Sequence, residues 1–128
     1  MPNHTVFIVN PISGRGAGMI AATALQDLAK NAGLDFKITT TTEVGHAIRL
    51  AQEAAVDGAE VVVAVGGDGT ANEVLNGLMQ ARLAGLGSPT MGVIGFTTVI
   101  ASDKYAASGR ARKEYKCIGL RFHTGLLL

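Results

Sequence analysis

The stretch VVVAVGGDGTANEVLNGL, residues 61–78, decides the fold of this chain. Its first five residues are apolar and mostly β-branched, without polar alternation, which is typical of a strand covered by helices on both faces. The glycine-rich residues 66–70 come next, and the periodic apolar residues beyond them predict a helix. This order of strand, tight loop and helix indicates a parallel α/β sheet, in which ligands bind beyond the carboxyl ends of the strands.

The loop between this strand and this helix has the composition of an anion-binding loop. Gly66, Gly67 and Gly69 permit positive φ and leave no Cβ in the way of a ligand, so backbone N–H groups can approach it closely. Thr70 is expected to cap the helix, whose N-terminus offers unpaired N–H donors and the positive end of its dipole. A carboxylate there repels phosphate unless it holds a metal ion, takes a proton or contacts another polar ligand group. The sequence therefore predicts a phosphate site in which Asp68 is functional.

Strand and helix patterns alternate on both sides of this unit. Further strands are predicted at residues 6–9, 36–40 and 91–94. The helices between them are predicted from one apolar face of Ile20, Ala24, Leu25 and Leu28 that ends at Gly33, and another of Ala47, Ile48, Ala51, Ala54 and Ala55 that ends at Gly58. One helix in each connection implies parallel strands and right-handed crossovers. The predicted fold class is α/β, a three-layer, Rossmann-like parallel sheet with flanking helices.

A second glycine-rich loop follows the first strand at residues 13–18, where Arg15 supplies a fixed positive charge. Two familiar phosphate motifs do not fit it. The chain contains no Gly-Lys pair, so a Walker A loop is excluded. The glycines at 14, 16 and 18 have the wrong spacing for a dinucleotide fingerprint. Taken alone, this loop is only a weak indication of phosphate.

The composition narrows the possible classes of protein. A chain of 128 residues suffices for one domain, and its apolar runs are strand-sized, so no membrane span is expected. Residues 1–4 do not resemble the start of a secretion signal, and a cytoplasmic location is expected. The single Cys117 excludes an intramolecular disulfide, and His4, His46 and His123 lack metal-ligand spacing. We therefore expect no residues dedicated to a metal, and a solvated or hydrogen-bonded role for His46.

Residues 6–94 resemble the N-terminal nucleotide-binding domain of the diacylglycerol kinase catalytic family, which includes sphingosine kinases and bacterial lipid kinases. The resemblance rests on the motifs NPISG at residues 10–14, TTEVGHA at residues 41–47 and GGDGTANEVLNGL at residues 66–78. Because NAD kinases share the Gly-Gly-Asp-Gly core, a kinase of NAD or of another soluble hydroxyl is an alternative interpretation. Asn-Pro-x-Ser-Gly together with Asn-Glu-Val-x-Asn-Gly favours the lipid-kinase branch.

Members of this family transfer the γ-phosphoryl group of ATP to a lipid hydroxyl with Mg²⁺. The resemblance implies that Asp68 is the catalytic residue of this half, close to the phosphate and metal chemistry. ATP and Mg²⁺ are the expected cofactors, a lipid acceptor is expected for the full-length family, and no nucleic-acid partner is expected. The residues assigned to nucleotide binding are Asn10, Pro11, Ile12, Ser13, Gly14, Arg15, Thr41, Gly66, Gly67, Asp68, Gly69, Thr70, Asn72, Glu73 and Thr98.

The resemblance fades near Phe96. The family continues Pro-x-Gly-Thr-x-Asn-Asp-Phe-Ala, whereas residues 95–101 read GFTTVIA and keep only Thr98. The family's β-rich second half, which supplies further metal ligands, the general base and much of the lipid site, has no counterpart here. We therefore expect an ATP-binding domain at residues 1–98, in a chain truncated or altered after about Phe96. A non-catalytic nucleotide-binding module is the alternative.

Residues 99–128 differ in charge from what precedes them. The net charge is −3 over residues 1–98 and +4 over residues 99–128. The simplest interpretation is a solvated basic tail. Its charge also allows peripheral contact with an anionic membrane, and its apolar segments at residues 118–120 and 126–128 allow pairing between chains as a homo-oligomer.

Overall fold

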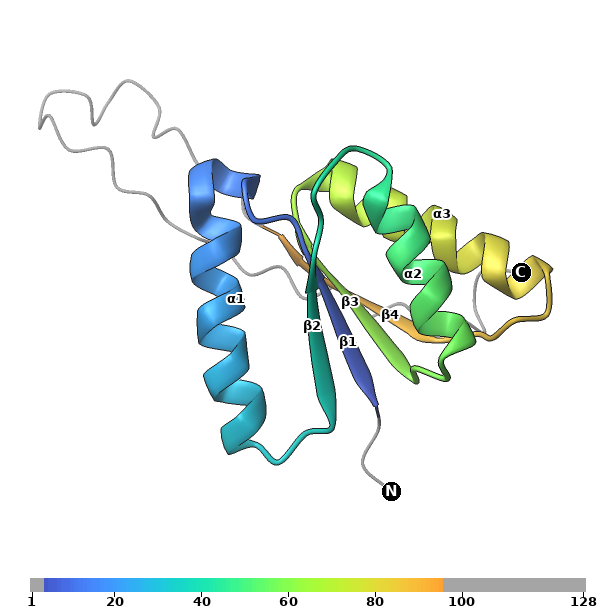
Figure 1. Ribbon diagram of the computed structural model, residues 1–128, viewed down its shortest axis with the longest axis horizontal. Helices are drawn as coiled ribbons and strands as arrows, with labels where there is room; N and C mark the ends of the chain where they lie inside the picture. The colour runs from blue at the N-terminus through green and yellow to red at the C-terminus, as the bar shows by residue number, and fades with distance from the viewer. Residues whose placement is uncertain (1–3, 96–128) are drawn as a thin grey trace, which may run out of the picture.

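The computed structural model describes residues 4–95, which form one parallel sheet with helices on both faces (Figure 1). All four strands are parallel and pair in the order β2-β1-β3-β4. The strands are β1 (Thr5–Val9), β2 (Phe36–Thr40), β3 (Val61–Gly66) and β4 (Thr90–Gly95), and the helices are α1 (Ser13–Asn31), α2 (His46–Val56) and α3 (Asp68–Leu83). The predicted three-layer α/β architecture is confirmed.

Each face of the sheet has its own apolar core. Val6 and Ile8 of β1 belong to the core shared with α2 and α3, whereas Phe7 and Val9 belong to the core under α1. Figure 1 shows the same division, with α1 on one side of the sheet and the other two helices on the opposite side. Successive side chains of a strand point to opposite faces, so a strand between two helical layers needs apolar residues at every position. This is why β1 and β3 show no polar alternation.

Helix α1 packs through small residues rather than through its large ones. The predicted buried face was wrong for Ile20 and Leu28, which are 70% and 65% exposed, and for Ala24, which is exposed as well. The buried residues are Ala17, Gly18, Ala22 and Ala29. The physical reason lies at Gly18, where an added Cβ would stand 1.9 Å from the carbonyl oxygen of Asn10. Small side chains let α1 lie close to this carbonyl and turn its larger side chains outward.

Helices α2 and α3 also meet through small side chains. An added Cβ at Gly77 would stand 2.4 Å from the carbonyl oxygen of Ile48 and 2.8 Å from the Cβ of Ala51. The predicted alanine stripe of α2 is confirmed, because Ala47, Ala51, Ala54 and Ala55 are all buried. Gly77 therefore belongs to the packing of the two helices, whose relative position sets one wall of the site described below.

Helices α1 and α2 end where the glycine pattern predicts, and α3 ends in the same way. Gly33, Gly58 and Gly85 follow the last turns of the three helices with φ values of +69°, +84° and +71°, the left-handed region that favours glycine. Within residues 4–95, no helix is both long and apolar enough to cross a bilayer.

The strand order reverses between β1 and β3. From β1 the chain passes through α1 to β2 on one side, then returns through α2 to β3 on the other side of β1. The connections leaving β1 and β3 therefore run to opposite faces of the sheet (Figure 1). In open α/β sheets this topological switch point leaves a crevice beyond the carboxyl ends of the strands, where ligands bind.

Candidate functional site

A hollow of about 630 Å³ lies beyond the carboxyl ends of the central strands. Three connections contribute to it: the β1–α1 loop, the β2–α2 loop and the first turns of α3. The lining residues are Asn10, Pro11, Ile12, Thr41, Thr42, Glu43, Val44, Gly69, Thr70 and Glu73. The three stretches that sequence analysis singled out are thus brought together by the switch in strand order.

The N-terminus of α3 opens into this hollow. Gly67 precedes the helix in an extended conformation and provides no side-chain cap. The first helical hydrogen bond runs from the Ala71 N–H to the Gly67 carbonyl, at 3.1 Å. The N–H groups of residues 68–70 come before this bond and have no acceptor within the helix. Together with the helix dipole, they make this turn suited to an anion.

The predicted roles of the glycines and of Thr70 in the turn at residues 66–70 were wrong. Thr70 was predicted to cap α3, but the helix starts two residues earlier and Thr70 is buried at 6% exposure. Gly66, Gly67 and Gly69 are not among the residues with positive φ. A Cβ at Gly66 would stand 2.7 Å from the Thr70 hydroxyl oxygen, so Gly66 makes room for the Thr70 side chain beneath the turn. Close packing, not backbone handedness, requires this glycine.

The β1–α1 loop is braced by Asn10. Its N–H donates to the Val65 carbonyl at 2.9 Å, and its side-chain oxygen accepts from the Ile12 N–H at 3.2 Å. Its carbonyl accepts from the Ser13 N–H at 3.2 Å. The Ser13 hydroxyl oxygen lies 3.6 Å from where a Cβ on Gly67 would stand, so the two glycine-rich loops are neighbours. Asn10 thus ties the end of β1 to β3 and shapes the loop between them.

Residues 14–16 interrupt the first turn of α1. Gly14, Arg15 and Gly16 have φ values of +61°, +57° and +93°, and Arg15 is the one non-glycine residue with positive φ among residues 4–95. Such a conformation costs about 1 kcal/mol for a residue with a Cβ. Arg15 is exposed and lies outside the residues that line the hollow.

The β2–α2 loop forms the opposite wall of the hollow. Thr41 donates its N–H to the Val9 carbonyl at 2.8 Å, and the Thr42 N–H donates to His46 Nδ1 at 3.0 Å. The expectation of a hydrogen-bonded His46 is confirmed. The Gly45 N–H donates to Glu73 Oε1 at 2.7 Å, so the Glu73 carboxylate, predicted to bind nucleotide, holds this loop.

Sequence reasoning missed three lining residues, Thr42, Glu43 and Val44, although their place after a strand in the TTEVGHA stretch was a usable signal. Seven of the predicted residues line the hollow: Asn10, Pro11, Ile12, Thr41, Gly69, Thr70 and Glu73. Ser13, Gly14, Arg15, Gly66 and Gly67 belong to the same loops but are not among its lining residues. Asp68 and Asn72 are exposed on the first turns of α3, outside the lining set. Thr98 and the predicted tail of residues 99–128 lie outside the described residues.

Residues 4–95 contain no group of three or more His, Cys, Asp and Glu side chains that could hold a metal ion. Asp68 is a single exposed carboxylate beside the free N–H groups of α3. This arrangement fits Mg²⁺, which commonly takes one or two protein carboxylates and completes its shell with phosphate oxygens and water. It does not fit an ion bound by protein ligands alone.

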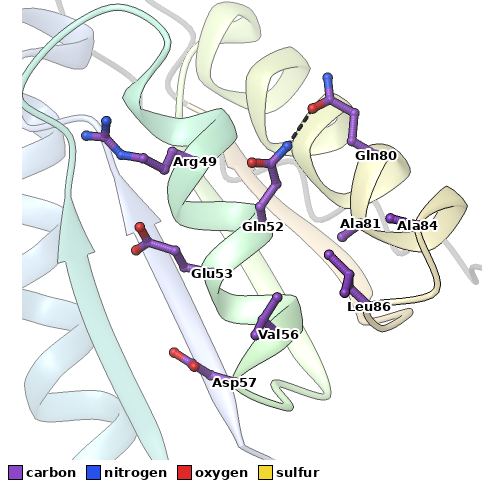
Figure 2. A pocket seen from close by; sticks show the side chains of 9 residues that line it. All are labelled: Arg49, Gln52, Glu53, Val56, Asp57, Gln80, Ala81, Ala84 and Leu86. Atoms are coloured by element: carbon purple, nitrogen blue, oxygen red, sulfur yellow. Dashed lines mark hydrogen bonds between the residues drawn. The ribbon is translucent and has the colours of Figure 1, made fainter.

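A larger hollow of about 720 Å³ lies between α2 and α3 and is a poorer candidate (Figure 2). Gln52 donates to Gln80 across it, and its lining includes Asp57 and Ala84, the residues that follow the last turns of the two helices. Helix C-termini present carbonyl oxygens and the negative end of the dipole, which repel phosphate. The hollow at the switch point, with its helix N-terminus, is the better anion site.

The parallel sheet and the reversal of strand order define a doubly wound α/β domain, and the helix N-terminus opening into a hollow marks its candidate ligand site. The sequence of residues 4–99 matches the family described as diacylglycerol kinase catalytic domain. The chain belongs to this family.

Individual relatives agree with this assignment. The chain is 38% identical over 107 residues to the diacylglycerol kinase of Bacillus subtilis, covering 84% of this chain and 33% of that protein. It is 31% identical over 113 residues to a Chromohalobacter salexigens protein named "Probable lipid kinase YegS-like", covering 88% of this chain and 35% of that protein. A crystal structure of a diacylglycerol kinase from Bacillus anthracis superimposes with a TM-score of 0.60 at 30% identity, covering 75% of this chain and 34% of that one. The chain thus spans about a third of the length of these relatives.

Proposed function

We propose that this chain is the ATP-binding part of a lipid kinase that transfers the γ-phosphoryl group of ATP to a lipid hydroxyl. The observation that carries the proposal is the meeting of three family motifs around one hollow, with the N-terminus of α3 opening into it. The relatives named as diacylglycerol and lipid kinases support a lipid acceptor. A lipid substrate implies work at the surface of a membrane, and we propose a cytoplasmic protein that meets this surface peripherally.

The residues of this half suit phosphoryl transfer, which depends mainly on positioning and on neutralising charge. The N–H groups of residues 68–70 would bind phosphate oxygens, and Arg15 would add positive charge from the neighbouring loop. Asp68 would hold Mg²⁺, which supplies charge neutralisation on the phosphates when it is bound. Acceptor binding and proton removal from the hydroxyl belong to the rest of a full-length kinase in this proposal.

Replacing Asp68 with Asn tests the metal-dependent part of this proposal. Asn keeps the size of the side chain but removes the charge, so we expect Mg·ATP to bind about tenfold more weakly to Asp68→Asn than to the wild type. ATP without metal should bind a fewfold more tightly, because the carboxylate no longer repels its phosphates. Calorimetric titration with and without Mg²⁺ measures both effects.

Asp57→Asn is the matched control, since Asp57 is exposed at the far end of α2. It should leave both affinities unchanged. An equal response to Mg²⁺ in the wild type and in Asp68→Asn would contradict the role of Asp68. A wild-type chain that binds neither Mg·ATP nor ADP would contradict the proposed function itself.

Two exposed apolar side chains at the hollow test where the nucleotide base lies. Ile12 is 80% and Val44 97% exposed, and they line the hollow from different loops. We expect the nucleotide base to cover these two side chains. Removing an apolar side chain of this size from water is worth about 1.5 kcal/mol, which would stabilise the complex. Ile12→Asn and Val44→Asn should each weaken ADP binding about tenfold at nearly unchanged melting temperature.

Leu83→Asn is the control for this pair, because Leu83 is 84% exposed at the end of α3, away from the hollow. Its ADP affinity should equal that of the wild type. If Ile12→Asn and Val44→Asn bind ADP as the wild type does, the base lies elsewhere.

A further inference from the structure

Side chains from outside the β2–α2 loop, residues 41–45, hold two of its backbone N–H groups. Helix α2 begins after Gly45, which has a φ of +86° and gives no side-chain cap. The Thr41 N–H reaches the Val9 carbonyl, the Thr42 N–H reaches His46 Nδ1, and the Gly45 N–H reaches Glu73 Oε1. Two of these three anchors are therefore side chains, and each can be removed without changing the loop itself.

The Glu73 anchor is a short, charge-assisted hydrogen bond. The bond of 2.7 Å joins α3 to a loop 28 residues earlier in the chain, and it is partly buried. Ionised acceptors form stronger hydrogen bonds than neutral ones. The carboxylate also lies at the N-terminus of α2, where the helix dipole favours negative charge. Glu73 is thus engaged in holding Gly45.

The His46 anchor depends on one ring nitrogen. Nδ1 lies 3.0 Å from the Thr42 backbone nitrogen and 3.3 Å from the Thr42 hydroxyl oxygen. To accept from a backbone N–H, Nδ1 must carry no proton, so the ring proton is on Nε2. An asparagine side chain offers a carbonyl oxygen near the position of Nδ1, whereas alanine offers no acceptor.

We propose that Glu73 and His46 are positioning residues, which set the β2–α2 loop as a preformed wall of the nucleotide site. This proposal rests on the proposed nucleotide-binding function. It assigns Glu73 to the loop instead of to the nucleotide or its metal ion. The loop brings Thr41, Thr42 and Val44 to the hollow, so its order before binding lowers the cost of binding.

The test compares Glu73→Ala with Glu73→Gln, and His46→Ala with His46→Asn, in the whole chain. Without ligand, NMR should show about tenfold faster amide exchange at Gly45 in Glu73→Ala and at Thr42 in His46→Ala. Binding of ADP should weaken about fivefold in both alanine variants. Gln and Asn restore a neutral acceptor, so both measurements should move back toward the wild-type values. Glu53→Ala, on the exposed part of α2, should change neither.

The same titrations separate a positioning residue from a ligand. A positioning Glu73 leaves the ratio of Mg·ATP affinity to metal-free ATP affinity unchanged in Glu73→Gln. A changed ratio, or no rescue of ADP binding by Gln, would assign Glu73 to the nucleotide or its metal and overturn the proposal. Unaltered exchange at Gly45 in Glu73→Ala would overturn it as well. Amide exchange is measured without ligand, so it tests the positioning role of Glu73 even if the wild type does not bind nucleotide. Failure of the wild type to bind nucleotide would contradict the proposed function instead.

Discussion

Replacing Gly18 with alanine is expected to lower the melting temperature of this chain by more than about 10 °C, because overpacking against a fixed backbone costs about 3 kcal/mol here. The new Cβ would stand 1.9 Å from the Asn10 carbonyl oxygen and 3.2 Å from the Cα of Pro11, and neither atom can move away as a flexible side chain would. Alanine favours a helix over glycine by about 1 kcal/mol, which is too little to offset this clash. Calorimetric melting of the purified chain measures the difference.

The same substitution should also weaken nucleotide binding in whatever fraction remains folded. Asn10 braces the β1–α1 loop, and α1 cannot accommodate the methyl group without displacing that residue. Gly69→Ala is the control for stability, because a Cβ at Gly69 meets no atom within 4 Å. It should melt at or slightly above the wild-type temperature. A Gly18→Ala chain that melts within 2 °C of the wild type would show that α1 does not lie this close to the loop.

Gly77→Ala should produce a comparable loss of stability, about 2–3 kcal/mol, through the contact between α2 and α3. Its Cβ would meet the Ile48 carbonyl oxygen at 2.4 Å and the Ala51 Cβ at 2.8 Å. Moving the helices apart would also stretch the bond between Glu73 and Gly45, so we expect faster amide exchange at Gly45 in this variant. Chemical denaturation and NMR exchange measure the two effects separately.

Asn76→Ala is the control for Gly77→Ala, because Asn76 is the preceding residue of α3 and is exposed. Its free energy of unfolding should stay within about 0.5 kcal/mol of the wild type, because exposed helix positions respond mainly through propensity. Equal stability of Gly77→Ala and Asn76→Ala would contradict the close packing of the two helices.

The family motifs and the packing glycines belong to one physical arrangement. Gly18 brings α1 against the Asn10 loop, Gly77 brings α2 against α3, and Gly66 admits the side chain of Thr70 beneath the α3 turn. Each contact sets the position of a different side of the hollow. Substitutions at these three glycines, which do not line the hollow, should therefore alter nucleotide binding by moving the backbone of the loops that do.

The order of strands and helices, the parallel sheet and the stretches that surround the site follow from the amino-acid sequence alone. Unbroken apolar runs indicate strands buried on both faces, and glycines in the left-handed region mark the helix ends; these are local consequences of side-chain shape and backbone freedom. The position of the candidate site follows as well, because the carboxyl ends of parallel strands share one edge of the sheet.

Only the tertiary structure decided which face of α1 is buried, what Gly66 and Thr70 do, and which group Glu73 contacts. Helical periodicity places Ile20 and Leu28 on one face but cannot reveal that the Asn10 carbonyl leaves room only for small residues. Likewise, the sequence does not distinguish a glycine that adopts a positive φ from one that leaves room for a neighbouring side chain. Glu73 meets Gly45 because α2 and α3 pack side by side, and such long-range contacts depend on packing between elements instead of on the residues adjacent in the chain.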